Sequence, residues 1–197
     1  MKLTSLIHYC GGLAFSLALL APTARADEGG ALYTMDNAAG ANHVVVFRRG
    51  ENGGLTGAGS FATGGAGAGA GLSSQGSVLL SRDNRWLFVC NAGSSEISVF
   101  AVTREGLALG DKVDSGGRMP VSLALGHNLL YVLNAGGGAG DKDNLTAFIF
   151  ANGKLLALPG STQALSADNT RTGAGFFHSR RRRAGGHRTA DEPDRHL

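Results

Sequence analysis

Aromatic residues are scarce in this sequence, and their scarcity limits the kind of fold it can form. They make up 7% of the 197 residues, whereas glycine occurs 32 times. Glycine in a helix interior costs about 1 kcal/mol relative to alanine, and no helical stripe of apolar residues follows residue 26. The composition therefore excludes a helical bundle and favours a turn-rich, all-β protein.

Cysteine and histidine are also few, which restricts the available chemistry. Cys10 lies near the N-terminus and Cys90 in the apolar run 86–90. This setting predicts that Cys90 is a small buried hydrophobic residue rather than a nucleophile. No group of His, Cys, Asp and Glu has the spacing of metal ligands, and we expect neither a metal ion nor another cofactor.

The N-terminal residues show the ordered features of a secretory signal peptide. Lys2 supplies a positive charge, a short apolar run follows, and Ala24 and Ala26 form an A-x-A cleavage site. The apolar run is shorter than the roughly 20 residues that a membrane-spanning helix needs. We therefore expect residues 1–26 to be removed and the mature chain to be exported to the periplasm or the extracellular medium, without a membrane anchor. Cleavage would also remove Cys10, so the mature chain could form no intramolecular disulfide.

Positive charge is concentrated at the two ends of the chain. The formal net charge is +3, yet residues 27–170 contain nine basic and twelve acidic residues. The central part thus lacks the basic surface that nucleic-acid binding requires. We expect no nucleic-acid partner.

A repeat with a period of about 40 to 50 residues runs through the central part. Each copy has an apolar run ending near an Asn, a turn of small residues, a second apolar run ending in Phe, and a polar turn. The landmarks are Asn37, Asn91 and Asn134, and Phe47, Phe100 and Phe148. Short β-branched and aromatic runs at this period are typical of four-stranded β-propeller blades. We therefore predict a partial β-propeller of about three blades in residues 27–170.

The first repeat is longer than the others because it contains the glycine–alanine run 64–71. Insertions within a repeat map to loops. The run lacks the Gly-Lys-Ser/Thr ending of a phosphate-binding loop, and no helix pattern follows it. We predict a flexible loop between two strands.

Several segments in order carry a resemblance to a known family. They are Leu32–Met35 with Asn37, Leu80–Phe88, Asn91–Phe100, and Arg118–Ser122 followed by Leu130–Gly136. Together they resemble the propeller lactonase family, which includes 6-phosphogluconolactonase-like proteins and muconate-lactonising cyclases. The resemblance covers residues 31–170 and implies a ring of seven blades, of which this chain holds about three. It also implies a small-molecule lactone or sugar acid as ligand.

Three functional interpretations follow from the resemblance. The parent protein is a carboxylic ester hydrolase acting on a sugar-acid lactone, or it is a non-catalytic exported propeller that binds a ligand or a protein, because one fold serves both uses. In the third interpretation the chain is an inactive fragment, since an open arc of three blades exposes strand edges and an apolar blade face. The sequence leaves the oligomeric state open.

No catalytic residue is identified by the sequence, although lactone hydrolysis needs a general base and a donor near the developing oxyanion. Asn91 and Asn134 are candidates for binding substrate hydroxyls, but an Asn at such a place is also typical of a turn. Arg118 is a candidate for holding a carboxylate or a phosphate, or is an exposed loop residue. His43 and His127 are expected to be exposed turn residues.

Residues 171–197 differ in character from the repeats. They include a run of four arginines, show no apolar alternation, and are predicted to be a disordered tail. When plausible GC-rich codons for residues 177–197 are read one nucleotide later, a Pro-Asp-Gly turn and a Leu-Val-Val strand result, as expected of a fourth blade. We interpret the tail as the product of a frameshift in the gene or in its sequencing.

Overall fold

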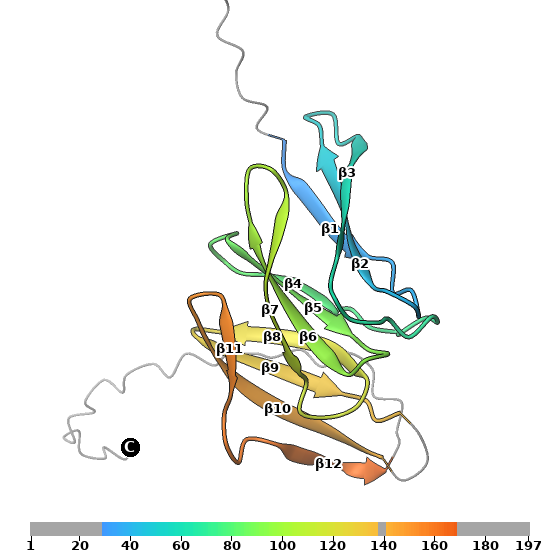
Figure 1. Ribbon diagram of the computed structural model, residues 1–197, viewed down its shortest axis with the longest axis vertical. Coiled ribbons are helices and arrows are strands. Elements are labelled where there is room, and N and C mark those ends of the chain that lie inside the picture. Colours follow the sequence, from blue (N-terminus) through green and yellow to red (C-terminus); the bar gives the residue numbers. More distant parts are fainter. Residues whose placement is uncertain (1–28, 138–140, 169–197) are drawn as a thin grey trace, which may run out of the picture.

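The computed structural model describes residues 29–137 and 141–168, and its regular structure in these ranges is entirely β-strand. The strands form three antiparallel sheets that follow one another along the chain and lie side by side (Figure 1). The predicted all-β, partial-propeller class is thus confirmed, with each sheet as one blade. The predicted signal peptide, residues 1–26, and the predicted tail, residues 171–197, lie outside the described residues.

The first blade has three strands and the other two follow a four-strand plan. The first blade contains β1 (Ala31–Met35), β2 (His43–Arg49) and β3 (Leu55–Ala62). The second contains β4 (Val78–Leu80), β5 (Trp86–Asn91), β6 (Glu96–Val102) and β7 (Leu107–Asp114). The third contains β8 (Pro120–Gly126), β9 (Leu129–Asn134), β10 (Lys142–Ala151), β11 (Lys154–Ala157) and β12 (Gln163–Asp168). Both β11 and β12 pair with β10, so together they form the outer edge of that blade.

The outer strands are irregular at the same place in each blade. A β-bulge interrupts the pairing, with Ala58 as the extra residue in the first blade and Gly110 in the second. In the third blade the interruption is longer, because β11 ends at Ala157 and β12 begins at Gln163. The repeat predicted from the sequence is therefore also a repeat of backbone pairing.

Two apolar clusters fill the spaces between the blades. The first contains Val44, Val46, Leu87, Val89 and Phe100. The second contains Phe88, Cys90, Ile97, Val99, Leu123, Leu130, Val132, Phe148 and Leu155. Successive side chains of a strand point to opposite faces, so β5 contributes alternate residues to both clusters. This explains why its sequence is continuously apolar.

Cys90 is fully buried in the second cluster. Burial raises the pKa of its thiol far above the ordinary range. Because the thiolate is the reactive form of cysteine, Cys90 is confirmed as a buried apolar residue.

Replacement of Phe88 tests the packing of the second cluster. Phe88 is fully buried, and its ring meets the ring of Phe150 edge-on with a centroid distance of 4.9 Å. We expect Phe88→Ala to lower the free energy of unfolding by about 3–5 kcal/mol in chemical denaturation. Leu109 is 47% exposed, so Leu109→Ala should cost less than about 1 kcal/mol. Equal losses in the two variants would contradict this assignment of the core.

Candidate functional site

The loops of the three blades gather at one end of the molecule, which we call the loop end. It consists of the loops between β1 and β2, between β5 and β6, and between β9 and β10, together with the segments that lead from one blade to the next. These are residues 36–42, 63–77, 92–95, 115–119 and 135–137 with 141. The short turns between the remaining strands lie at the opposite end, which we call the turn end.

A cleft of about 890 Å³ opens beside β1 at the loop end. One wall consists of residues 33–38, at the end of β1 and just beyond it. The other consists of residues 69–75 together with Ser77 and Val78, which lead into β4. Its lining includes Tyr33 and Asp36. Burial raises the pKa of Tyr33.

Asp36 is the acidic residue of the cleft. Its Oδ2 lies 2.9 Å from Nδ1 of His43, and its Oδ1 accepts the backbone N–H groups of His43 and Ala38 at 2.9 and 3.1 Å. Burial alone would raise the pKa of Asp36, but these hydrogen bonds and the nearby imidazole lower it overall. Asp36 is therefore a carboxylate that fixes the orientation of the His43 ring. His43 is thus a half-buried residue at the start of β2, not the exposed turn residue predicted from the sequence.

Asn91 and Asn134 lie in the joints between blades rather than in the cleft, and both are fully buried. Oδ1 of Asn91 accepts a hydrogen bond from Nδ2 of Asn42 at 3.0 Å. Nδ2 of Asn134 donates to the backbone oxygen of Ser115 at 3.2 Å and to Oδ1 of Asn144 at 2.9 Å. These hydrogen bonds give both asparagines a role in packing the blades against one another. Their role in binding substrate stays a prediction.

The sequence predicts that Asn37 is equivalent to Asn91 and Asn134. Strand pairing shows that Asp36 holds the equivalent position instead. β1, β5 and β9 each pair with the strand that carries the repeated phenylalanine, and the last paired positions beside that strand are occupied by Asp36, Asn91 and Asn134. Asn37 follows one residue later with a φ of 52°. Its Nδ2 donates to the backbone oxygen of Ala70 at 2.7 Å, so it anchors the glycine–alanine run.

That run, residues 64–71, is a loop as predicted, but it is held between the first two blades. Gly67 N donates to the oxygen of Ala38 at 2.8 Å, and Gly93 N donates to the oxygen of Ala66 at 3.0 Å. A Cβ atom on Gly67 would lie 2.2 Å from the carbonyl carbon of Asn37. The prediction of a flexible loop is therefore wrong, because the glycines permit close backbone approach instead.

Arg118 lies in the segment that joins the second and third blades. Its Nε is 3.2 Å from Oδ2 of Asp141, and its side chain is 69% exposed. An exposed pair of this kind contributes little to stability. The exposed guanidinium can also reach an anionic ligand, but its predicted role in substrate binding remains a prediction.

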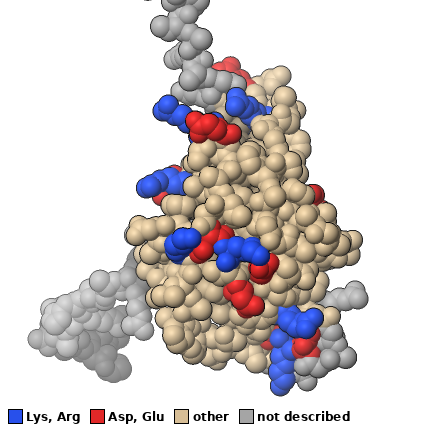
Figure 2. Space-filling model, viewed as in Figure 1, with Lys and Arg blue, Asp and Glu red and all other residues tan. Residues whose placement is uncertain are grey.

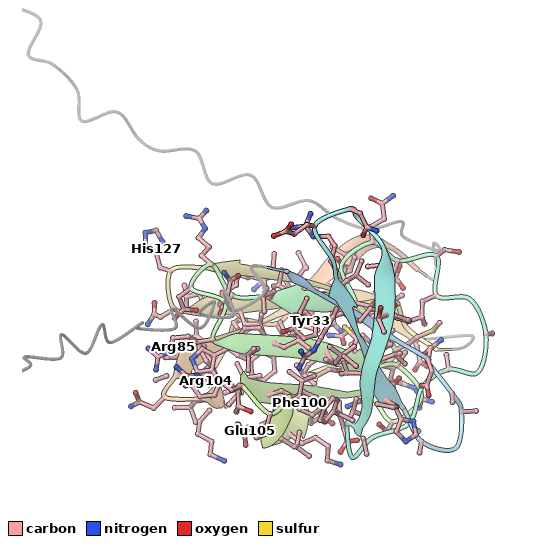
Figure 3. All side chains as sticks on the ribbon, turned by 90° about the horizontal axis from the view of Figure 1, so that it is seen from above. Tyr33, Arg85, Phe100, Arg104, Glu105 and His127 are labelled. Atoms are coloured by element: carbon pink, nitrogen blue, oxygen red, sulfur yellow. The ribbon has the colours of Figure 1, made fainter. Side chains whose placement is uncertain are left out.

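The turn end carries a different set of side chains. Figure 3 shows Arg85, Arg104, Glu105 and His127 toward this end, whereas Tyr33 lies among the strands. His127 is exposed in the turn between β8 and β9, as predicted, with a φ of 56°. On the face seen in Figure 2, basic and acidic side chains lie next to one another on a largely uncharged surface. That face has no continuous basic patch.

The described residues contain neither a cluster of metal ligands nor a helix that could span a membrane. No group of three or more His, Cys, Asp and Glu side chains among residues 29–137 and 141–168 is arranged to hold a metal ion. Nor do these residues form a helix long and apolar enough to cross a bilayer.

A family model described as "Lactonase, 7-bladed beta-propeller" matches residues 41–157. The search of curated proteins found no match.

Several solved structures are similar to the chain. A protein from Lactobacillus plantarum is 24% identical, with 60% of this chain and 37% of that chain covered and a TM-score of 0.47. A putative 6-phosphogluconolactonase from Bacteroides fragilis is 23% identical, with 70% and 37% covered and a TM-score of 0.47. The periplasmic gluconolactonase of Pseudomonas aeruginosa is 24% identical, with 64% and 34% covered and a TM-score of 0.49. The chain thus spans only 34 to 37% of the length of these structures.

Alanine at Gly67 tests whether the glycine–alanine run is a packed element of the site. We expect Gly67→Ala to lower the free energy of unfolding by about 1–3 kcal/mol, because the new Cβ forces the loop away from Asn37. Gly71 is the matched control in the same run, since its Cβ would meet no atom within 4 Å. A Gly67→Ala variant as stable as Gly71→Ala in denaturant titrations would show that the loop is not packed there.

Proposed function

Because the chain belongs to the seven-bladed β-propeller lactonase family, we propose that the complete protein is an exported hydrolase of sugar-acid lactones. The observation that carries this proposal is the extent of the family match, which runs from β2 through β11 and so includes all three blades. Export is supported by the order of charge, apolar run and A-x-A site in residues 1–26.

Hydrolysis of a lactone adds water to the ring carbonyl, expels the ring oxygen and yields a hydroxy acid. The reaction needs a proton acceptor for the water and a donor for the developing oxyanion. We assign Arg118 to the binding of the acidic or phosphorylated part of the substrate, because a guanidinium offers paired donors that match carboxylate and phosphate oxygens. The 69% exposure of the Arg118 side chain at the loop end, where its Nε lies 3.2 Å from the half-buried carboxylate of Asp141, supports this assignment.

We further propose that the three described blades are inactive by themselves. The match is to a seven-bladed family, and a ligand site at the mouth of a closed ring draws on loops from several blades. Residues 29–168 supply the loops of three blades only.

Lactone hydrolysis by the complete ring is the test of this proposal. The reading frame after residue 170 is restored, and acid release from gluconolactone and 6-phosphogluconolactone is followed at constant pH. We expect hydrolysis clearly above the spontaneous rate, and none from the 197-residue chain. Arg118→Gln should lower kcat/KM by about 10- to 100-fold, the effect of one lost charged hydrogen bond. The control Arg104→Gln, at the turn end, should leave kcat/KM unchanged.

Two outcomes would count against the proposal in different ways. A complete, folded protein that hydrolyses neither lactone faster than background would favour the non-catalytic binding module. An active protein whose Arg118→Gln variant keeps full kcat/KM would leave the hydrolase in place and remove Arg118 from the site.

A further inference from the structure

We propose that Asp141 is a positioning residue, which orients the guanidinium of Arg118 so that its Nη groups receive an oxyanion of the ligand. The ligand class is a phosphate ester or a carboxylate, because both offer paired oxygens that match two parallel N–H groups of a guanidinium. The inference rests on the assignment of Arg118 in the proposed function. Its test measures binding rather than hydrolysis, so the two proposals can fail separately.

The backbone next to Arg118 is tied to both of the blades that it joins. Met119 N lies 3.4 Å from Oγ of Ser95, in the loop between β5 and β6. Ala135 N, just beyond β9, donates to the backbone oxygen of Met119 at 3.0 Å. Pro120 follows as the first residue of β8. Arg118 therefore extends from a backbone whose place is set by the second and the third blade.

Asp141 holds the guanidinium at one edge only. Its Oδ2 lies 3.2 Å from Nε of Arg118, and the same Oδ2 accepts the backbone N–H of Gly137 at 3.3 Å. The carboxylate is thus itself fixed by the backbone. Within residues 29–137 and 141–168, the structure gives the Arg118 side chain no partner besides Asp141. Because most N–H groups of a guanidinium belong to its Nη atoms, a contact through Nε leaves these groups for a ligand.

Two consecutive glycines make room for this ion pair. Gly136 has a φ of 60°, and a Cβ atom on it would lie 3.1 Å from the backbone oxygen of Asp141. A Cβ atom on Gly137 would lie 3.3 Å from Nε of Arg118 and 3.6 Å from Oδ2 of Asp141. The backbone of Gly137 is not left-handed. A side chain at position 137 would therefore disturb the guanidinium rather than the backbone.

Asp141 has two opposing effects on an anionic ligand, and the orienting effect is the larger. An arginine side chain loses rotamer freedom when it holds a ligand, and a side chain that is already oriented loses less. The negative charge of Asp141 also repels an anion. Arg118 is 69% exposed, so water and salt screen this repulsion. We therefore expect loss of Asp141 to weaken anion binding.

Binding of inorganic phosphate to the full 197-residue chain tests the proposal. The signal is the Nε–H resonance of Arg118 in proton–nitrogen correlation spectra, assigned by its loss in Arg118→Gln. We expect phosphate to shift this resonance until it saturates. Asp141→Asn should weaken phosphate binding about two- to fivefold, the size of the effect of an exposed ion pair. Glu51→Gln removes the same charge from the exposed turn between β2 and β3, and it should leave the affinity unchanged.

Gly137→Ala separates the orientation of Arg118 from the charge of Asp141. It keeps both charges and displaces the guanidinium, so it should also weaken phosphate binding, by about two- to fivefold. Gly126→Ala is the matched control, because a Cβ atom on this last residue of β8 would meet no atom within 4 Å. Its affinity should equal that of the original chain.

Gluconate identifies the source of the oxyanion. A shift of the Arg118 resonance by phosphate but not by gluconate assigns the site to a phosphate group. The reverse result assigns it to the carboxylate of a sugar acid. Both results support the proposal, because either ligand uses the same paired N–H groups.

Three results would overturn the proposal. Tighter phosphate binding by Asp141→Asn would show that Asp141 competes with the ligand for Arg118. Unchanged affinity in both Asp141→Asn and Gly137→Ala would show that the ion pair does not orient the guanidinium. Absence of a shift with either oxyanion would show that Arg118 holds no anion. A complete ring that hydrolyses no lactone, with these shifts intact, would remove the proposed hydrolase and leave the anion site in place.

Discussion

A buried chain of hydrogen bonds joins the first two blades, and the positions of the loop end and the cleft depend on it. Nδ2 of Asn42 donates to Oδ1 of Asn91 at 3.0 Å, Nδ2 of Asn91 donates to Oγ of Ser98, and Ser98 Oγ donates to the backbone oxygen of Thr63, both at 2.8 Å. These groups are buried, where an unpaired polar atom is costly. A Cβ on Gly65 would lie 2.5 Å from the side chain of Asn91, so the joint closes only with glycine there.

The joint between the second and third blades repeats this design with different residues. Asn134 reaches the backbone oxygen of Ser115, and Thr146 Oγ1 donates to the oxygen of Gly116 at 3.3 Å. A Cβ on Gly117 would lie 2.7 Å from the side chain of Asn134. In both joints an asparagine at the end of a second strand packs against the segment that leaves the preceding blade. Asp36 occupies the equivalent position at the end of β1, on the face turned away from the second blade.

The sequence predicts the blades better than it predicts their joints. Apolar runs such as that of β5 and the repeated phenylalanines are local patterns, so they indicate the strands and their period directly. The local sequence does not show whether Asp36 or Asn37 is equivalent to Asn91 and Asn134. The two residues are adjacent and both favour turns, so only strand pairing distinguishes them. The contacts of Gly67 and the pairing of His43 with Asp36 depend on segments brought together by folding. A glycine-rich run alone cannot distinguish a packed loop from a flexible one.

A double-mutant cycle on Asn42 and Asn91 tests the central claim most directly, namely that a buried hydrogen-bonded pair holds the blades together. The free energies of unfolding of Asn42→Ala, Asn91→Ala and the double variant are measured by denaturant titration. We predict a coupling energy of about 1–3 kcal/mol. Once one asparagine is replaced, the hydrogen bond between the two side chains is already lost, so replacing the other removes no further interaction between them. Additivity within about 0.5 kcal/mol would contradict it, since the two side chains would then act independently.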